Sequence, residues 1–474
     1  MDFTIFIFLT SGLFLGWSLG ANDAANVFGT AVGSRMIRFT TAAIISSIFI
    51  ILGAVLSGAG AAHGLGKLGA LNALPGAFMT ALAAAVTVYW MTRLSLPVST
   101  TQAIVGAIVG WNWYSGSITN MAELSKIVGT WIAAPILGAV FSAITYKITT
   151  WVIKKAQIHL IRLDAYTRVG LVVAGAFGAY SLGANNIGNV MGVFVSSSPF
   201  TDIQIKDLAT FTSVQQLFLL GAVAIAVGVF TYSKKVMMTV GDSLMPLTPV
   251  AAWVVVIAQS IVLFLFASVS LEHFLISHGL PSIPLIPVSS SQAVVGAVIG
   301  IGLVYGKKGA KQIRWRVLGN IASGWVSTPI ISATICFVML FFLQNVFNQQ
   351  VYKEVYFQLD KPVLEYLERQ GIETEPLADL EGKKIAKAVA FRDLVRERYG
   401  YTPEQQRTIV SAAQIYPMRI EPDKVRKLDH SYLSESQIEA VAQLMGKEYR
   451  YKWQLAEDLA ALAPAWKEKP KTKL

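Results

Sequence analysis

Residues 18–34 read SLGANDAANVFGTAVGS, and residues 181–197 read SLGANNIGNVMGVFVSS. The two stretches align without a gap, and ten of their seventeen positions are identical. Each lies in a long apolar run, where a carboxylate such as Asp23 is unfavourable unless it has a partner or a function. The presence of two copies of this motif indicates an internal duplication of the chain, and the motif marks a candidate functional site.

Two further pairs of segments follow in the same order. Residues 96–110, LPVSTTQAIVGAIVG, match residues 286–300, IPVSSSQAVVGAVIG, at nine of fifteen positions. Residues 129–139, GTWIAAPILGA, match residues 323–333, SGWVSTPIISA, more weakly. The shared order and spacing predict two repeats, at residues 1–163 and 164–346.

The composition is that of a membrane protein. Hydrophobic residues make up 54% of the 474, charged residues make up 14%, and the mean hydropathy is +0.53. Most of the apolar stretches are long enough to cross about 30 Å of hydrocarbon as helices. The start of the chain lacks the features of a cleaved signal peptide, so it is expected to be a retained first segment. The ten stretches are 3–33, 40–62, 75–94, 97–111, 127–149, 168–197, 209–231, 249–271, 286–305 and 317–345.

Two of these ten stretches stand apart. Residues 97–111 and 286–305 each open at a proline, and the first is too short for a full span, so both either cross or dip in and return. With five stretches per half, the predicted fold class is an all-α polytopic membrane protein. Its two inverted-topology repeats have about five membrane segments each, with broken or re-entrant helices.

Charge in the loops predicts the orientation of the repeats. The first 350 residues hold eighteen Lys and Arg against eight acidic residues. The basic residues follow the odd-numbered stretches, which predicts cytoplasmic odd loops, an outside N-terminus and an inverted second half. The net charge of +11 thus reflects membrane-flanking residues, and a nucleic acid partner is not expected. These loop residues are Arg35, Arg38, Arg93, Lys154 through Arg168, Lys234, Lys235, and Lys307 through Arg316.

Cysteine and histidine usage excludes several classes of chemistry. The single cysteine, Cys336, excludes a disulfide framework and a thiolate cluster. The five histidines are scattered and form no metal-ligand spacing, so metal-dependent hydrolysis is not expected.

The GANDAAN motif offers oxygen ligands. Gly20 is expected to interrupt the helix, which leaves side-chain oxygens one turn apart, and hard oxygen ligands of this kind suit sodium. Asp23 is the only acidic residue between Asp2 and Glu123. The oxygen donors are Asn22, Asp23 and Asn26 in the first copy and Asn185, Asn186 and Asn189 in the second.

The PVSTTQ motif offers donors to an anion. Pro97 is expected to end one helix, and Ser99, Thr100 and Thr101 to open the next, where unpaired N–H groups and the helix dipole favour an oxyanion. Ser289, Ser290 and Ser291 repeat the arrangement behind Pro287. Two such starts facing each other near the midplane would hold a tetrahedral anion without Lys or Arg.

Structural interpretations of the same residues remain open. Small residues in membrane helices often allow only close packing, and Ser or Thr often bond back to their own helix. Trp131 and Trp325, which match in the duplication, are interpreted as packing or interfacial anchors.

These motifs resemble those of the inorganic phosphate transporter (PiT) family of symporters, over about residues 1–346. The resemblance implies an inverted-repeat importer of phosphate, forming a homodimer in the cell membrane, driven by sodium in most members and by protons in some. Sodium ions would be the coupling ions, with no other cofactor. The resemblance assigns phosphate to Ser99, Thr100, Thr101, Gln102, Ser289, Ser290, Ser291, Gln292, Asn22 and Asn185, and sodium to Asn22, Asp23, Asn26, Asn185, Asn186 and Asn189.

One departure from the family pattern leaves alternatives. The second copy has Asn186 where the family often keeps an aspartate, so the coupling stoichiometry is open. The alternatives are a proton-coupled phosphate or metal-phosphate symporter, and a sulfate permease, which the presence of Asp23 disfavours. An intramembrane enzyme with Asp23 as acid or base is a further alternative. The symmetric motifs, without a repeated His, Lys or Cys, speak against an enzyme.

Residues 347–474 differ in composition, with 21 basic and 20 acidic residues after position 350. Helical periodicity predicts a soluble, mainly helical region, and no active-site motif is recognised in it. Ten crossings place this region outside, although regulatory tails are more often cytoplasmic.

Overall fold

A computed structural model describes residues 3–69, 71–93, 98–205, 209–234, 236–238, 245, 247–425 and 433–467. The chain divides into two compact units. The first comprises residues 1–114 and 119–352, and the second comprises residues 115–118 and 353–474. The break expected at Pro97 lies outside the described residues, as do residues 468–474 at the end of the chain.

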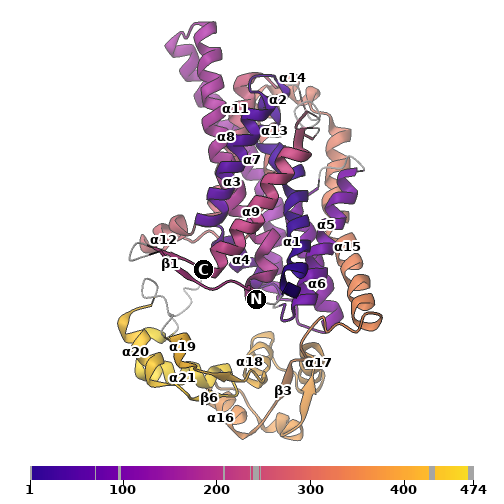
Figure 1. The fold of residues 1–474 in the computed structure, drawn as a ribbon, viewed down its shortest axis with the longest axis vertical. Helices are drawn as coiled ribbons and strands as arrows, with labels where there is room; N and C mark the ends of the chain where they lie inside the picture. Colours follow the sequence, from indigo (N-terminus) through magenta and orange to yellow (C-terminus); the bar gives the residue numbers. More distant parts are fainter. Residues whose placement is uncertain are drawn as a thin grey trace. The chain divides into compact units, whose positions relative to one another are not determined.

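In the first half of the first unit, all of the regular secondary structure in the described residues is helical (Figure 1). The expected stretch 3–33 forms two helices that meet at Asp23, and the stretch 40–62 also forms two. The helices are α1 (Phe3–Asn22), α2 (Ala24–Gly33), α3 (Phe39–Ser57), α4 (Ala59–Gly66), α5 (Leu74–Arg93), α6 (Thr100–Ser115) and α7 (Met121–Ala156).

The second half is also mainly helical, but its short helices do not all fall at the same places as those of the first half. A two-stranded antiparallel hairpin, in which Ile203 pairs with Phe211, precedes α9 and has no counterpart in the expectation from sequence. The elements are α8 (Leu160–Met191), the 3-10 helix η1 (Gly192–Ser197), β1 (Ile203–Ile205), β2 (Ala209–Phe211), α9 (Ser213–Thr231), α11 (Pro249–Ala267), α12 (Val269–Ser277), α13 (Ser290–Val304), α14 (Gly306–Gln312) and α15 (Trp315–Asn345).

This unit is a multi-pass membrane bundle. Within the described residues, seven helical spans are long and apolar enough to cross a bilayer. The doubtful stretches become α6 and α13, which have only 16 and 15 residues, so neither crosses as a helix alone. The long helix α7 exposes an apolar stripe at four-residue spacing, as a lipid-facing helix does. The stripe contains Ile132, Ile136, Val140, Ile144 and Ile148.

Matching glycines make reciprocal contacts between the halves. A Cβ placed on Gly106 of α6 lies 2.2 Å from the carbonyl oxygen of Pro329 in α15. The corresponding Cβ on Gly296 of α13 lies 2.0 Å from the carbonyl oxygen of Pro135 in α7. Glycine is therefore needed at both positions for the backbones to approach. Each short helix packs on the long, proline-containing helix of the other half.

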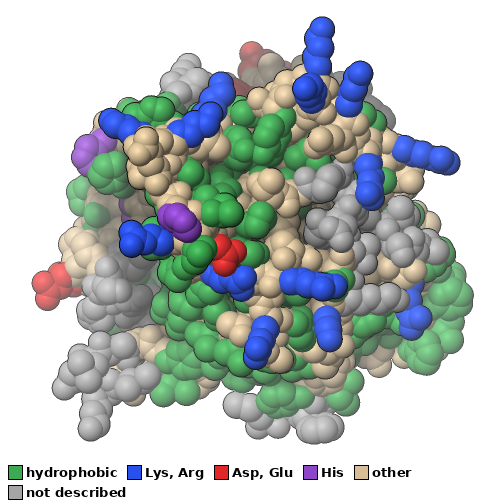
Figure 2. All heavy atoms as spheres, turned by 90° about the horizontal axis from the view of Figure 1, so that it is seen from above, with side chains coloured by type: hydrophobic (Ala, Val, Ile, Leu, Met, Phe, Trp, Pro, Cys, Tyr) green, Lys and Arg blue, Asp and Glu red, His purple; other side chains and the backbone are tan. Residues whose placement is uncertain are grey.

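One end of the bundle is basic. In Figure 1, α2 and α14 are labelled near one end of the first unit, and α4 and β1 near the other. Figure 2 looks onto the end with α2 and α14, where Lys and Arg side chains outnumber Asp and Glu. Arg35 and Arg38 follow α2, while Lys307, Lys308 and Lys311 lie on α14.

The second unit has its own core, in which Phe357 and Phe391 stack at 5.3 Å beside the buried Leu367 and Ile409. Helices predominate, and two antiparallel two-stranded sheets, β3 with β4 and β5 with β6, link them. The elements are β3 (Tyr356–Gln358), α16 (Lys361–Arg369), η2 (Glu375–Leu380), β4 (Lys384–Ala386), α17 (Ala388–Tyr399), α18 (Pro403–Ala413), β5 (Met418–Arg419), α19 (Pro422–Val425), α20 (Glu435–Gln443), β6 (Glu448–Tyr449), α21 (Lys452–Leu462) and η3 (Pro464–Trp466).

Candidate functional site

The first polar motif straddles the junction of α1 and α2. The expectation that Gly20 interrupts the helix was wrong, because α1 continues through Gly20 to Asn22. Gly20 is instead a packing position, since a Cβ there would lie 2.0 Å from the carbonyl oxygen of Ile225 in α9. The helix pauses at Asp23, which keeps right-handed helical dihedrals of −77° and −31°.

Asp23 is a buried carboxylate with one oxygen free. Thr100 donates a hydrogen bond of 2.9 Å to Oδ2, and the nearby Asn26 donates one of 3.5 Å to Ser290 at the start of α13. Oδ1 has no hydrogen-bond partner among the described residues. Asp23 thus lies between the start of α6 and the start of α13, and it keeps an acceptor for a ligand.

The second motif lies in a continuous helix. α8 runs without a break through Asn185, Asn186 and Asn189 to Met191, so the two motifs differ in backbone as well as in charge. Asn185 makes two hydrogen bonds to the backbone of Val288, just ahead of α13. Its Nδ2 donates to the Val288 carbonyl oxygen at 2.7 Å, and its Oδ1 accepts from the Val288 N–H at 2.9 Å. Both ends of this amide are therefore engaged by the backbone.

Other hydrogen bonds join the two halves at the same level. Asn189 Nδ2 donates to Thr101 Oγ1 at 2.9 Å and to Asn186 Oδ1 at 2.9 Å. Asn26 Nδ2 donates to Ser290 Oγ at 3.5 Å. Thr101 Oγ1 also reaches the carbonyl oxygen of Val288 at 3.5 Å. These bonds bring the starts of α6 and α13 together, although almost 190 residues separate them in sequence.

The helix starts have matching caps. Ser99 Oγ accepts from the N–H of Gln102 at 3.3 Å, and Ser289 Oγ accepts from the N–H of Gln292 at 3.3 Å. Each serine satisfies one of the unpaired donors at the helix start. The remaining N–H groups and the hydroxyls of Ser290 and Ser291 are donors that an anion can use, whereas Thr100 and Thr101 direct their hydroxyl hydrogens to Asp23 and to the Val288 carbonyl in this structure. The hydroxyl of Ser291 lies 3.0 Å from that of Ser289.

Several buried polar atoms of the site lack partners. An unpartnered buried polar atom is unfavourable by about 1–3 kcal/mol, so each such atom needs a partner, which a bound water, ion or ligand can supply. The amide orientations of asparagine and glutamine are assigned from hydrogen bonding, and either end can face a ligand. Among the described residues, the atoms of the predicted site without a partner are Asp23 Oδ1, Asn186 Nδ2, Asn189 Oδ1, Gln102 Oε1 and Gln292 Oε1.

Within the described part of the chain, Asp23 has no buried Lys or Arg to pair with. Among the residues whose exposure is described, Asp23 is the one Asp, Glu, Lys or Arg that is buried. The described residues also contain no group of three His, Cys, Asp or Glu that could hold a metal ion. The oxygens near Asp23 are carboxylate, amide and hydroxyl oxygens, which are hard ligands.

Sequence reasoning missed two polar residues of the bundle. Thr92 is one of them, because Asn22 Nδ2 donates to its Oγ1 in α5 at 2.8 Å. Gln259 of α11 is completely buried, and neither of its side-chain polar atoms has a partner among the described residues. Thr92 is a polar residue in an apolar stretch, and such a residue alone is only weak evidence of a functional role. Gln259 has no match in the repeated motifs, so the duplication could not point to it.

Comparison with known proteins places these features in a family. A sequence profile described as the phosphate transporter family matches residues 19–336 and, in a second match, residues 281–415. Two relatives are each named "Putative phosphate permease". The protein of Methanocaldococcus jannaschii is 27% identical over 340 residues, which cover 72% of this chain and 98% of the relative. The protein of Thermococcus kodakarensis is 25% identical over 411 residues, which cover 71% of this chain and 96% of the relative.

The fold is similar to that of a solved membrane protein. The solved structure named "The sodium-dependent phosphate transporter" matches 72% of this chain and 100% of its own chain, with a TM-score of 0.54 and 24% sequence identity. The family profile covers both copies of the two polar motifs that form the buried site. This chain belongs to the phosphate transporter family.

Proposed function

We propose that the protein is a secondary active transporter that imports inorganic phosphate together with sodium ions. The observation that carries this proposal is the buried carboxylate of Asp23, which has a free oxygen, no buried Lys or Arg beside it, and two helix starts around it. A site that joins a fixed negative charge to anion-binding helix starts needs cations to bind with the anion. Sodium would be that cation, because the site offers hard oxygen ligands.

The proposed roles follow the two kinds of motif. Sodium binds at the oxygens of the asparagine and aspartate residues, and phosphate binds at the hydroxyls, amides and N–H groups of the helix starts. The contacts of Asn185 with Val288, and of Ser99 and Ser289 with their own helices, support a second role for these three in positioning the starts. The full proposed set remains Asn22, Asp23, Asn26, Ser99, Thr100, Thr101, Gln102, Asn185, Asn186, Asn189, Ser289, Ser290, Ser291 and Gln292.

We also propose that residues 1–163 and 164–346 are inverted repeats, which alternately open the central site to the two sides of the membrane. The reciprocal contacts of Gly106 and Gly296 support a two-fold relation between the halves. The gathering of Lys and Arg at one end of the bundle supports a cytoplasmic location for that end (Figure 2). Residues 347–474 would then lie outside, because ten crossings return the chain to the side of its N-terminus.

Further parts of the proposal come from the family resemblance. The protein is expected to act as a homodimer, which cross-linking in the membrane would test. It is not expected to be an enzyme. The symmetric set of asparagine, serine and threonine residues supports binding and release, because it lacks the asymmetric acid and base of a hydrolytic site.

Uptake of radiolabelled phosphate into proteoliposomes tests the function directly. We expect uptake with an inward sodium gradient, and background uptake when choline replaces sodium. Dependence on a proton gradient instead would identify the proton-coupled alternative. Stronger inhibition by sulfate than by unlabelled phosphate would identify a sulfate permease. The absence of ion-driven uptake of either anion would contradict the transport proposal.

Charge balance makes a second, quantitative expectation. Two sodium ions neutralise Asp23 and one monobasic phosphate, whereas an uncompensated charge is strongly unfavourable at low dielectric. Sodium should therefore tighten phosphate binding, and phosphate should tighten sodium binding by the same factor. Calorimetric titration of phosphate over a range of sodium, with choline holding the ionic strength, measures both. A phosphate Kd that does not move with sodium would rule out this coupling.

A further inference from the structure

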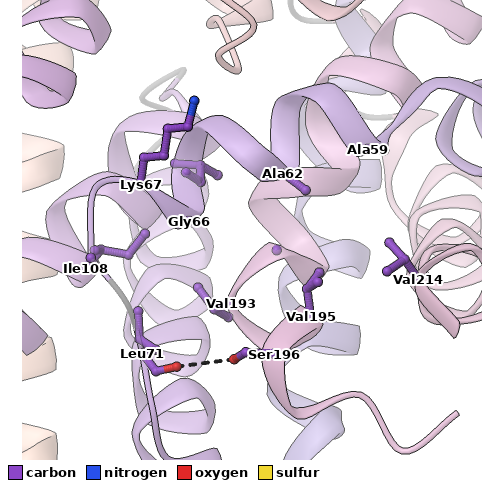
Figure 3. A pocket seen from close by; sticks show the side chains of 13 residues that line it. Ala59, Ala62, Gly66, Lys67, Leu71, Ile108, Val193, Val195, Ser196 and Val214 are labelled. Atoms are coloured by element: carbon purple, nitrogen blue, oxygen red, sulfur yellow. Dashed lines mark hydrogen bonds between the residues drawn. The ribbon is translucent and has the colours of Figure 1, made fainter. Parts of the chain in front are cut away.

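A cavity of about 500 Å³ lies within the first unit, and Figure 3 shows residues that line it. The helix α4, which forms part of its wall, is labelled in Figure 1 at the end of the bundle away from α2 and α14. None of the residues proposed to bind sodium or phosphate lines the cavity. Its walls come from α4, the segment after α4, α6, η1 and the start of α9. Small residues, including Ala59, Ala62 and Gly192, keep the space open.

The cavity ends close to the polar site along two helices. Gly192 follows Asn189 by three residues, which is one helical turn, and a Cβ on Gly188 would meet the Ala62 backbone nitrogen at 2.7 Å. Ile108 lies on α6 about 10 Å along the axis from Thr101. The hydrogen bond of 2.9 Å between Asn189 and Thr101 thus joins these two helices at the level of the helix starts, where the path from the cavity meets the site.

The rim of the cavity carries one charge. Among the described residues that line it, Lys67 is the only charged one, and its side chain is exposed. None of the ion pairs between described residues involves Lys67. Figure 3 shows Lys67 at the edge of the group, and the hydrogen bond of 3.2 Å from Ser196 to the Leu71 carbonyl lies farther along the wall.

We propose that this cavity is the outer vestibule through which phosphate reaches the site, and that Lys67 steers the anion into it. The inference rests on the proposed function. Low-dielectric walls focus the field of a single cation, which raises the local concentration of an anion. Among the described lining residues no second charge is present, and the hydroxyl of Ser196 already donates to the Leu71 carbonyl, so the walls offer little to hold phosphate before it reaches the helix starts. The anion passes inward when the contact between Asn189 and Thr101 opens.

Cysteine substitution tests the path, because Cys336 is the only cysteine of the chain and is buried. In a Cys336→Ser parent, Ser196→Cys samples the outer wall and Gly192→Cys the inner one. A Cβ at Gly192 meets only Ala62, at 3.8 Å, so this substitution is accommodated. A negatively charged, membrane-impermeant methanethiosulfonate added outside intact cells should label both cysteines and block phosphate uptake. Phosphate with sodium should slow the labelling at Gly192→Cys.

Two controls separate the possible outcomes. Lys308→Cys, on the basic end, should stay unlabelled from outside and react in inside-out vesicles. No labelling of either vestibule cysteine from outside, or labelling that leaves uptake unchanged, would overturn the vestibule. Faster labelling by a neutral, apolar maleimide, without protection by phosphate, would indicate a lipid-filled groove and also overturn it. Absence of phosphate uptake in the unlabelled Cys336→Ser parent would instead contradict the proposed function.

Charge at Lys67 provides an independent readout. Lys67→Glu should raise the KM for phosphate at least about threefold at low ionic strength and leave maximal uptake unchanged, while Lys67→Arg should match the parent. The effect should shrink as choline chloride is added, because salt screens an exposed charge. Lys126→Glu, which changes an exposed lysine already paired with Glu123, is the matched control. Equal KM values for Lys67→Glu and Lys67→Arg would overturn the steering role.

Discussion

The two copies of the GAN motif share most of their sequence but are built differently. In the first copy the helix pauses at Asp23, whose Oδ1 stays without a partner among the described residues. In the second copy α8 continues unbroken, and its asparagines bond to one another and to the Val288 backbone. The two copies of the motif are thus similar in sequence but differ in local structure. One leaves a carboxylate oxygen without a partner among the described residues, and the other bonds to the backbone ahead of the opposing helix.

The difference has an electrostatic reason. Two carboxylates in one buried site repel each other, and each would need its own cation. With asparagine at position 186, the site carries a single fixed negative charge, and the second copy keeps the hydrogen-bonding geometry without adding to it. The comparison between the copies therefore makes predictions that differ for matched residues.

The largest expected difference is between the charged residue and its counterpart. Asp23→Asn should reduce sodium-driven phosphate uptake to background, because the fixed charge that binds sodium is lost. The double variant Asp23→Asn with Asn186→Asp restores the charge count in the second copy, and it should remain inactive because Asn186 is bonded to Asn185 and Asn189.

Uptake into proteoliposomes measures this pair, and size-exclusion profiles check that each variant is folded. Full sodium-dependent uptake by Asp23→Asn would contradict the assignment of Asp23 as a sodium ligand. Rescue by the double variant would show that only the number of charges matters and that the two copies are interchangeable.

The next effect concerns the helix starts. Replacing Ser99, Thr100 and Thr101 together by Ala removes hydroxyl donors to a desolvated anion, each worth about 1.5–3 kcal/mol when the partner is charged. Phosphate affinity should fall at least about tenfold. Equilibrium binding of labelled phosphate at saturating sodium measures the change. An unaltered Kd would mean that the anion binds elsewhere in the chain.

A smaller difference should separate Asn185 from Asn22. Asn185→Ala breaks two buried hydrogen bonds to Val288 and should lower the free energy of unfolding by about 1–3 kcal/mol. Asn22→Ala removes one hydrogen bond, to Thr92, and should lower it by about 1 kcal/mol. Thermal unfolding in detergent without ligand compares the two. A larger loss for Asn22→Ala would reverse the assignment of the second copy as the structural frame.

The smallest difference is expected where the copies pack alike. A Cβ on Gly20 would lie 2.0 Å from the Ile225 carbonyl oxygen, and one on Gly183 would lie 2.2 Å from that of Ile50. Gly20→Ala and Gly183→Ala should each destabilise the protein by about 1–3 kcal/mol, with little difference between them. Gly319→Ala, where nothing lies within 4 Å, is the control. A large difference in unfolding temperature between Gly20→Ala and Gly183→Ala would contradict the conclusion that the two copies pack alike.

The sequence by itself determined the membrane character, the order of the segments and the polar residues of the site. Hydrophobic runs are local, so the stretches at 75–94 and 317–345 agree closely with α5 and α15. The prolines marked 97–111 and 286–305 as unusual, and these became the short helices α6 and α13. The duplication also matched Pro135 with Pro329, which occupy equivalent places against Gly296 and Gly106.

Only the tertiary structure decided which of these residues touch. A repeated motif predicts repeated structure, yet the helix breaks in one copy only, and Gly20 proved to be a packing position. Asn185 meets a backbone 103 residues away, and Asn189 meets Thr101 from the other half. Such contacts depend on how helices cross in three dimensions, which periodicity along one helix does not encode. The same reason explains why the cavity beside Lys67 has no signal in the sequence, since its walls come from segments between residues 59 and 214.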